Sequence, residues 1–340
     1  MVIAEDASPE EWDGFVERHA DGTGDHLWHW RDVFADVFGQ QCVYLAARAQ
    51  GEIVGVLPMA LFRSRLFGRF AVSLPYLNYG GVLASSPDVA DALVRHAAQI
   101  TRTFGGSHLE LRHRARQCPS LPSRDHKVAL TMALPATADA LWTSVDRKAR
   151  NQVRKAQKEG LTSQTGGLEL VDEFYPVFAE NMRDLGTPVY SRRLFAETLR
   201  RFPKHVQVAI VRHQGKTIAG AFTFTFRDTA LVPWASSLRS HRHLCPNMLL
   251  YWSMMEGAIA SGARRFDFGR SSRGAGTHHF KTQWGADEAP LNWEYVLLTR
   301  ESAPDQGPGN SRFNLAIETW RRLPLWLSNR IGPAIVRNIP

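Results

Sequence analysis

Residues 267–281, DFGRSSRGAGTHHFK, carry side chains that can hold an anion and exchange a proton. Arg270 and Arg273 could bind a phosphate group, bidentately in the best geometry. The glycine between Asp267 and Arg270 would let the backbone come close to a ligand. Asp267 could accept a proton. Pairing with Arg270 is the favoured interpretation, because neighbouring arginines stabilise a charged carboxylate and lower its basicity.

His278 and His279 in the same run are alternative proton acceptors, because imidazole titrates near neutral pH. In a loop of this kind they can equally be hydrogen-bonding surface residues. Lys281, considered alone, is typical of a surface lysine at the end of a strand. The residues by themselves therefore assign no general base.

A second group of charges lies in RKARNQVRKAQKEG, residues 147–160. Ala149, Val153 and Ala156 are spaced four and three apart, which predicts a helix with a thin buried stripe and a broad basic face. Such a helix could bind phosphates or could simply be a solvated connection between domains. The cations expected to bind phosphate are Arg147, Lys148, Arg150, Arg154 and Lys155. The net charge of +8 also favours an anionic partner.

The elements that must position these residues occur twice in the chain. Residues 48–63, RAQGEIVGVLPMALFR, return at 212–227 as RHQGKTIAGAFTFTFR, with five identities in sixteen positions. Each copy predicts two strands joined by a tight turn, followed by a loop, a helix and a short strand. A repeat of this size predicts a duplicated domain whose two copies can build a cleft between them, and chance similarity of two hairpins is the alternative.

Length and composition agree with two soluble domains. The chain has 340 residues, of which 44% are hydrophobic and 22% charged. Its start lacks the pattern of a secretory signal, and the longest uncharged stretch, residues 71–87, is interrupted by proline and glycine. We therefore expect a cytoplasmic protein. Three cysteines without a CxxC spacing predict neither a metal site nor a disulfide framework.

The expected organisation is an α/β (α+β) fold with two domains, residues 1–135 and residues 136–300. A linker and an amphipathic helical tail, residues 301–340, follow the second domain. The strand LNWEYVLL, residues 291–298, is expected to close the second domain.

The order of elements resembles that of N-acyltransferases of the GNAT type. DFGRSSRGAGTHHFKTQWGA (267–286) and WASSLRSHRHLCPNMLLYW (234–252) are similar to the Fem-type family of double-GNAT aminoacyltransferases. LPYLNYGG, DLGTPVY and WRRLPLWLSNRIGP resemble the FemAB-like branch associated with exosortase and PEP-CTERM loci. The resemblance covers almost the whole chain. It implies two tandem GNAT-like domains, each a mixed twisted sheet flanked by helices.

The resemblance implies transfer of an amino acid from aminoacyl-tRNA to an amine on a peptidoglycan or other cell-envelope precursor, with no tightly bound cofactor. It places Lys281 near the reacting ester, in an electrophilic role on the carbonyl oxygen or the departing ribose oxygen. Asp267 is the other catalytic candidate. The residues expected to bind substrate are Asn78, Tyr79, Gly80, Gly81, Thr187, Tyr190, Asn247, Arg270, Arg273 and His279. Gly80 and Gly81 are also an ordinary turn signal.

Two other functions remain open at this stage. In coenzyme A-dependent GNAT enzymes, a glycine-rich loop grips the pyrophosphate at a helix start. The run SSLRSHRHLCPNMLL contains no glycine, which favours a donor other than acyl-CoA. Acyl-CoA-dependent acylation of an amino sugar or polysaccharide precursor is the first alternative. A catalytically inactive GNAT pair that serves an exosortase or exopolysaccharide system as a binding component is the second.

The tail mixes tryptophans with arginines. Trp320 and Trp326 alternate with basic residues in 313–337, so the segment could lie on an anionic membrane surface or pack against the domain. The acceptors usual for the family are lipid-linked. The resemblance therefore adds an expectation of peripheral contact at the inner face of the membrane.

Overall fold

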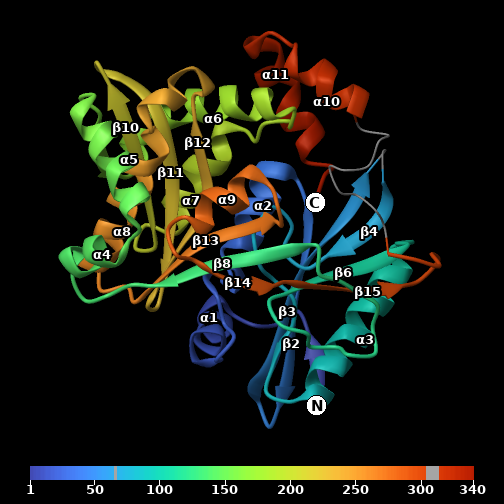
Figure 1. Cartoon of the computed structure of the whole chain (residues 1–340). Coiled ribbons are helices and arrows are strands. Elements are labelled where there is room, and N and C mark those ends of the chain that lie inside the picture. The colour runs from blue at the N-terminus through green and yellow to red at the C-terminus, as the bar shows by residue number, and fades with distance from the viewer. Residues whose placement is uncertain (65–66, 304–313) are drawn as a thin grey trace. The chain divides into compact units, whose positions relative to one another are not determined.

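The structure is a computed structural model of the 340-residue chain, and it describes residues 1–64, 67–303 and 314–340. Its contacts divide the chain into two compact units (Figure 1). Unit 1 consists of residues 1–127, 290–307 and 334–340, and unit 2 of residues 128–289 and 308–333.

Unit 1 is a mixed sheet with helices on both faces. The order of strands along the sheet is β1-β2-β3-β4-β6-β15-β7, and the short β5 pairs with β3. Its strands are β1 (Val2–Ala4), β2 (Gln41–Ala49), β3 (Glu52–Ser64), β4 (Gly68–Val72), β5 (Leu83–Ala84), β6 (His108–His113), β7 (Ser123–Arg124) and β15 (Asn292–Leu297). Its helices are α1 (Pro9–Arg18), α2 (Trp30–Phe38) and α3 (Pro87–Thr103).

Alternation along the strands gives unit 1 two separate apolar layers. Leu45, Leu57 and Leu109 join Leu93 of α3 in one core cluster. On the aromatic side, Tyr44 of β2 lies 4.8 Å from the Trp12 ring of α1, measured between centroids. The helix pattern predicted from Ser8 onward is confirmed, because Ser8 caps α1 in a reciprocal capping box.

Unit 2 repeats this plan. Its strands follow the order β14-β8-β13-β12-β11-β10-β9. They are β8 (Lys127–Ala133), β9 (Thr162–Gly166), β10 (Val206–His213), β11 (Lys216–Phe226), β12 (Thr229–Ser237), β13 (Arg265–Ser272) and β14 (Asp287–Pro290). The helices are α4 (Ala138–Ser144), α5 (Arg147–Lys158), α6 (Val171–Leu185), α7 (Arg192–Arg201), α8 (Pro246–Ala260), α9 (Gly276–Thr282), α10 (Asn314–Arg321) and α11 (Leu325–Val336), of which α11 ends in unit 1.

The structure confirms that the repeated hairpins are equivalent. The turn residues Gln50 and Gly51 have φ of 53° and 89°, and Gln214 and Gly215 have φ of 51° and 79°. These values suit the two-residue turns that match the twist of a hairpin. In both hairpins the strand pairing shifts register just before the last two residues of the first strand. The shift lies between Ala47 and Arg48 in β2 and between Val211 and Arg212 in β10.

The repeated arginine explains one of the five identities. Arg48 of β2 donates to Glu11 of α1 at 2.9 Å, and Arg212 of β10 donates to Glu173 of α6 at 2.6 Å. Each carboxylate is the third residue of its helix. The same ion pair therefore fastens one helix of each unit, α1 or α6, to its hairpin.

Two strands differ from the expected domain boundaries. The segment expected to close the second domain, β15, instead pairs antiparallel with β6 of unit 1 over Asn292–Leu297. In the opposite direction, β8 follows unit 1 in the chain but lies beside β13 in the second sheet. Glu294 explains why β15 pairs with β6, because its buried carboxylate accepts a hydrogen bond from His113 of β6 at 2.6 Å.

The C-terminal helices pack against unit 2 for part of their length. Trp320 of α10 is only 8% exposed, whereas Trp326 of α11 is 69% exposed. Phe313, the first residue of the predicted membrane-contacting segment, lies outside the described residues. Among the described residues, no helix combines the length and the hydropathy needed to cross a bilayer.

Candidate active site

The predicted catalytic residues lie where two parallel strands of unit 2 part. β12 and β13 pair over only three residues, Thr229–Leu231 with Arg265–Asp267, although the strands continue to Ser237 and Ser272. Asp267 is the last residue of β13 that pairs with β12, and its side chain is 1% exposed. Beyond Asp267, β13 is therefore no longer paired with β12, although β8 remains its neighbour on the other side.

In unit 1 the corresponding strands part at the same place, but a loop fills the opening. β4 and β6 pair only through Ala71 and Val72. The amide of Ser73 then donates to the Glu110 carbonyl at 2.8 Å, and Gly80 donates to the Arg112 carbonyl at 2.9 Å. The loop after β4 thus supplies the partners of β6, and the parted strands of unit 2 are the better candidate for a ligand site.

Asp267 and Gly269 form a local turn within β13. One carboxylate oxygen of Asp267 accepts a hydrogen bond from the Gly269 amide at 2.8 Å, and Gly269 has φ of 72°. A positive φ of this kind favours glycine, because a Cβ would crowd the backbone. The positive φ gives this glycine a conformational role, and its expected close approach to a ligand stays a prediction.

Lys281 is a buried cation rather than a surface lysine at a strand end. It lies on α9 with 8% of its surface exposed, and its Nζ donates to the carbonyls of Gly269 at 3.2 Å and Arg270 at 3.0 Å. Burial lowers the pKa of Lys281 to about 8. Its ammonium has three donors, so the two carbonyls leave one N–H to point elsewhere.

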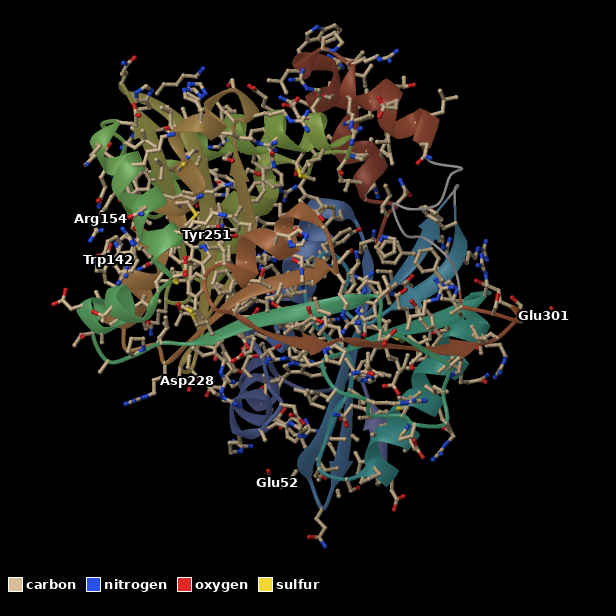
Figure 2. All side chains as sticks on the ribbon, viewed as in Figure 1. Glu52, Trp142, Arg154, Asp228, Tyr251 and Glu301 are labelled. Carbon is tan, nitrogen blue, oxygen red and sulfur yellow. The ribbon has the colours of Figure 1, made fainter. Side chains whose placement is uncertain are left out.

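Aromatic side chains hold α9 against β13. Tyr251 of α8 stacks on Phe268 of β13 with ring centroids 5.7 Å apart, and meets the edge of Phe280 of α9 at 4.9 Å. Figure 2 labels Tyr251 among the side chains of unit 2. These contacts explain why Lys281 is buried, because the residue beside it in α9 is fixed on the sheet. Sequence reasoning missed Tyr251, although its place in an apolar helix was a signal for core packing.

Glu288 of β14 is a second residue that sequence reasoning missed. It accepts hydrogen bonds from Arg273 and His278, both at 2.6 Å. The bond from Arg273, followed by that from His278, lowers the pKa of the Glu288 carboxyl. Arg273 therefore has a protein partner that competes with the expected phosphate. His279 is exposed, and Arg270 is half-buried beside Lys281.

The loop between β12 and α8 is built from cationic side chains rather than glycines. Residues Arg239–Leu244 form a 3₁₀ helix, and Cys245 precedes α8 with φ of 59°. Asn247 lies half-buried in the first turn of α8. The His241 ring of this loop approaches His213 of the neighbouring hairpin, with centroids 6.3 Å apart. A cradle made of glycine amides is not what this loop provides.

The basic helix has the predicted buried stripe. Ala149, Val153 and Ala156 are the buried residues of α5. Two of its arginines hold the neighbouring helix α4: Arg150 donates to the Trp142 carbonyl at 3.2 Å, and the Arg154 guanidinium lies 5.2 Å from the Trp142 ring (Figure 2). Arg150 and Arg154 therefore help to hold α4 against α5.

The remaining three predicted cations of α5 face solvent. Arg147, Lys148 and Lys155 are exposed and line a surface depression together with Asn151 and Gln152. This depression lies at the N-terminal half of α5, where backbone amides also favour an anion. It is the part of the helix best suited to phosphate.

The predicted acceptor residues of unit 1 are buried. Tyr79 is 1% exposed, and its amide donates to Asp25 at 2.9 Å. Asn78 is 8% exposed. Gly81 has φ of 96°, and a Cβ added there would lie 2.0 Å from the His113 ring. Gly80 is equally confined, 2.5 Å from the Ser73 carbonyl oxygen by the same measure, so both glycines have a packing reason.

The predicted acceptor residues of unit 2 lie next to the C-terminal helices. Gly186 ends α6 with φ of 78°, and an added Cβ would lie 2.5 Å from Ile317 of α10. The Tyr190 ring stacks on Phe178 at 6.2 Å, and its carbonyl accepts from Tyr175. Thr187 is exposed. The structure brings Lys281, Asp267 and Arg270 together, and it leaves Thr187 and Tyr190 in a separate group.

Comparisons with known proteins agree with the fold of the two units. Residues 144–282 match the family model described as an acetyltransferase (GNAT) domain. FemX is 15% identical with a TM-score of 0.67, over 88% of this chain and 98% of that one. A tandem GNAT protein from the clavulanic acid biosynthesis pathway is 14% identical with a TM-score of 0.54, over 89% of this chain and 99% of that one.

A third solved structure is the C-terminal domain (DUF2156) of a protein described as a lysylphosphatidylglycerol synthetase from Agrobacterium fabrum. It is 13% identical with a TM-score of 0.58, over 84% of this chain and 90% of that one. A search by sequence among curated proteins found no match. At these identities the structures show the fold. The chain thus has a FemAB-like fold of two tandem GNAT-like units, and residues 144–282 of unit 2 match the model of a GNAT acetyltransferase domain.

Proposed function

We propose that the chain is an aminoacyltransferase that forms an amide bond between an aminoacyl group, carried by tRNA, and an amine on a cell-envelope or exopolysaccharide precursor. The observation that carries this proposal is the buried Lys281 beside the parted ends of β12 and β13. Its burial keeps a positive charge in a low-dielectric place, where it acts most strongly on a developing oxyanion.

The reaction proposed is attack of a neutral amine on the ester carbonyl of the donor. A C–N bond forms, the carbonyl oxygen becomes negative, and the C–O bond to ribose then breaks. The third N–H of Lys281 is the group assigned to the negative oxygen or the departing ribose oxygen. The amine must lose one proton, and the ribose oxygen must gain one, so the substrates can exchange this proton between themselves.

Asp267 is the less suitable proton acceptor in this scheme. One of its oxygens already accepts a hydrogen bond from Gly269, and its negative charge favours the protonated form of Lys281. We therefore assign Asp267 a positioning role: it fixes the β13 turn whose carbonyls hold Lys281. A general base is not needed if the proton passes directly between the substrates.

The surface of α5 supports a nucleic-acid donor. Three exposed cations, Arg147, Lys148 and Lys155, lie along one depression without a carboxylate between them except the N-cap Asp146. The loop before α8 supports the same choice, because it presents cationic side chains in place of a glycine cradle. Acyl-CoA-dependent transfer remains the second candidate, favoured by the acetyltransferase model matched by residues 144–282.

The experiment is a parallel binding titration of the full chain with aminoacyl-tRNA, uncharged tRNA and acetyl-CoA at two salt concentrations. Tighter binding of aminoacyl-tRNA than of uncharged tRNA supports the proposal. Equal binding of both, with a steep dependence on salt, would show only attraction to a basic surface. Tight acetyl-CoA binding would replace the proposal with the second candidate. Binding of no donor would favour an inactive GNAT pair that acts as a binding component.

A further inference from the structure

Unit 1 contains a cavity of about 260 Å³ away from the parted strands. It lies where β2 begins and where β3 and α3 end, and the last residues of the chain complete it. The side chains and backbone used in the argument belong to Gly39, Gln40, Arg63, Phe104, Arg337 and Asn338. All of them are in unit 1.

Arg63 and Arg337 line this cavity, and Arg69 lies beside Arg63 at the ring of Phe104. The Arg63 guanidinium lies 5.0 Å from the Phe104 ring centroid, and the Arg69 guanidinium 6.0 Å from it. Arg69 also donates to the Phe104 carbonyl at 3.3 Å. The Arg337 guanidinium lies against Gly39, where an added Cβ would be 2.9 Å from Nη2. Within the described ranges, none of these arginines forms an ion pair, and no carboxylate lines the cavity.

Hydrogen bonds to its backbone carbonyl fix the position of Arg337. Its carbonyl accepts hydrogen bonds from Gln40 at 2.5 Å and from the Tyr76 hydroxyl at 2.9 Å. Tyr76 is 5% exposed and stacks on Phe38, with ring centroids 4.0 Å apart. The backbone of Arg337 is thus held by a buried residue, while its guanidinium reaches the cavity.

We infer that this cavity binds a phosphate or diphosphate ester. Like charges brought together without a counter-ion repel each other, and an anion relieves that repulsion. Guanidinium groups match phosphate oxygens with paired hydrogen bonds, and a phosphate dianion suits several cations better than a single carboxylate does. The Phe104 ring, which lines the cavity, offers an apolar contact for the organic part of the ester. This binding is separate from the proposed transfer in unit 2 and does not depend on it.

The test is calorimetric titration of the full chain with inorganic pyrophosphate at low salt. Arg63→Gln and Arg337→Gln should each weaken this binding about tenfold, since a hydrogen bond to a charged group is worth roughly one such factor. Arg227→Gln is the matched control. Arg227 occupies the same hairpin position in unit 2, with its guanidinium 5.0 Å from the Phe226 ring, so this variant removes an equal charge elsewhere.

Loss of affinity in Arg63→Gln and Arg337→Gln, with Arg227→Gln unchanged, supports the site. Arg63→Lys should bind with an intermediate affinity, because it keeps the charge and loses the paired geometry. No binding by the parent, equal losses in all three glutamine variants, or equal binding of citrate would overturn the proposal. Thermal melting of each variant confirms that it is folded. ADP and vesicles containing phosphatidic acid, compared with phosphatidylcholine vesicles, then distinguish a soluble ester from a lipid one.

Discussion

Replacing Lys281 with methionine tests the proposed chemistry, because it removes the ammonium and keeps an unbranched apolar side chain. Removing one oxyanion-stabilising donor typically lowers kcat by about 10²–10³. The variant also loses the hydrogen bonds to the Gly269 and Arg270 carbonyls, each worth roughly 1.5–3 kcal/mol. The desolvation cost of the buried cation, visible in its pKa of about 8, offsets part of that loss. We therefore expect a fall in unfolding free energy of about 1–3 kcal/mol.

The pH dependence separates the electrophilic role from a structural one. Because the pKa of Lys281 is about 8, its cation is present at pH 7 and is lost as the pH rises through 8. Enzyme-dependent transfer should therefore fall between pH 7 and pH 9. Lys281→Arg keeps its charge throughout this range, so any activity it retains should lack the fall.

Stability should follow the opposite trend with pH. The folded pKa of Lys281 lies below the value of 10.5 usual for a lysine, so the unfolded chain binds the extra proton between about pH 8 and pH 10.5. Unfolding free energy of the parent should rise with pH across this window, relative to Lys281→Met. Denaturant titrations at three pH values measure the difference.

The assay follows loss of the labelled aminoacyl ester from tRNA, with hydroxylamine as a small amine acceptor and heat-inactivated protein as the blank. Circular dichroism melting shows whether each variant is folded. The electrophilic role is refuted if folded Lys281→Met keeps its transfer rate within threefold of the parent. A rate that rises through pH 8, after subtraction of the blank, would also contradict it.

Three further perturbations test other parts of the structure. Gly81→Ala should lower the unfolding free energy by more than about 3 kcal/mol, because the added Cβ meets both a positive φ and the buried His113 ring. Gly160→Ala, where φ is also positive but the Cβ would enter open space, should lower it by about 1 kcal/mol. Denaturant titrations measure both values. Trp320→Ala should cost about 3–5 kcal/mol and Trp326→Ala almost nothing, and equal melting temperatures would contradict the packing of α10. Lys155→Gln should reduce the slope of log affinity for tRNA against log salt by about 1, and an unchanged slope would remove α5 from the tRNA surface.

Trp320 corrects the simplest form of the membrane prediction. A tail that only lay on a membrane would leave both tryptophans replaceable without harm to the fold, but Trp320 is buried and only Trp326 is exposed. A vesicle-sedimentation test of the tail should therefore use Trp326→Ala alone. Peripheral contact with an anionic membrane stays a prediction.

The sequence predicted what depends on local pattern. Gln50-Gly51 and Gln214-Gly215 predict their turns, and Ser8 predicts the start of α1, because each of these signals acts over a few residues. The stripe of α5 follows from spacing alone. What it could not predict depends on partners far along the chain. Glu294 finds His113 across 181 positions, and no periodicity encodes that pairing.

The same distinction applies to the site. Lys281 could be singled out only through family resemblance, because its burial arises from Tyr251 and Phe280 on two separate helices. Residue types around Arg273 suggested a phosphate site, but the partner that occupies it, Glu288, comes from the following strand. Charge types are visible in a sequence, whereas their pairing requires the fold.

The placement of β8 and β15 has a consequence for synthesis of the chain. The first sheet has no β15 until residue 297 has been made, so a nascent or truncated chain of residues 1–135 leaves one edge of β6 without its neighbour. Exposed strand edges of this kind recruit other chains and promote aggregation. Unit 1, although first in the sequence, therefore cannot complete its sheet until every strand of unit 2 has been made. A ribosome-bound chain stalled before β15 should depend on chaperones in a way that the full-length protein does not.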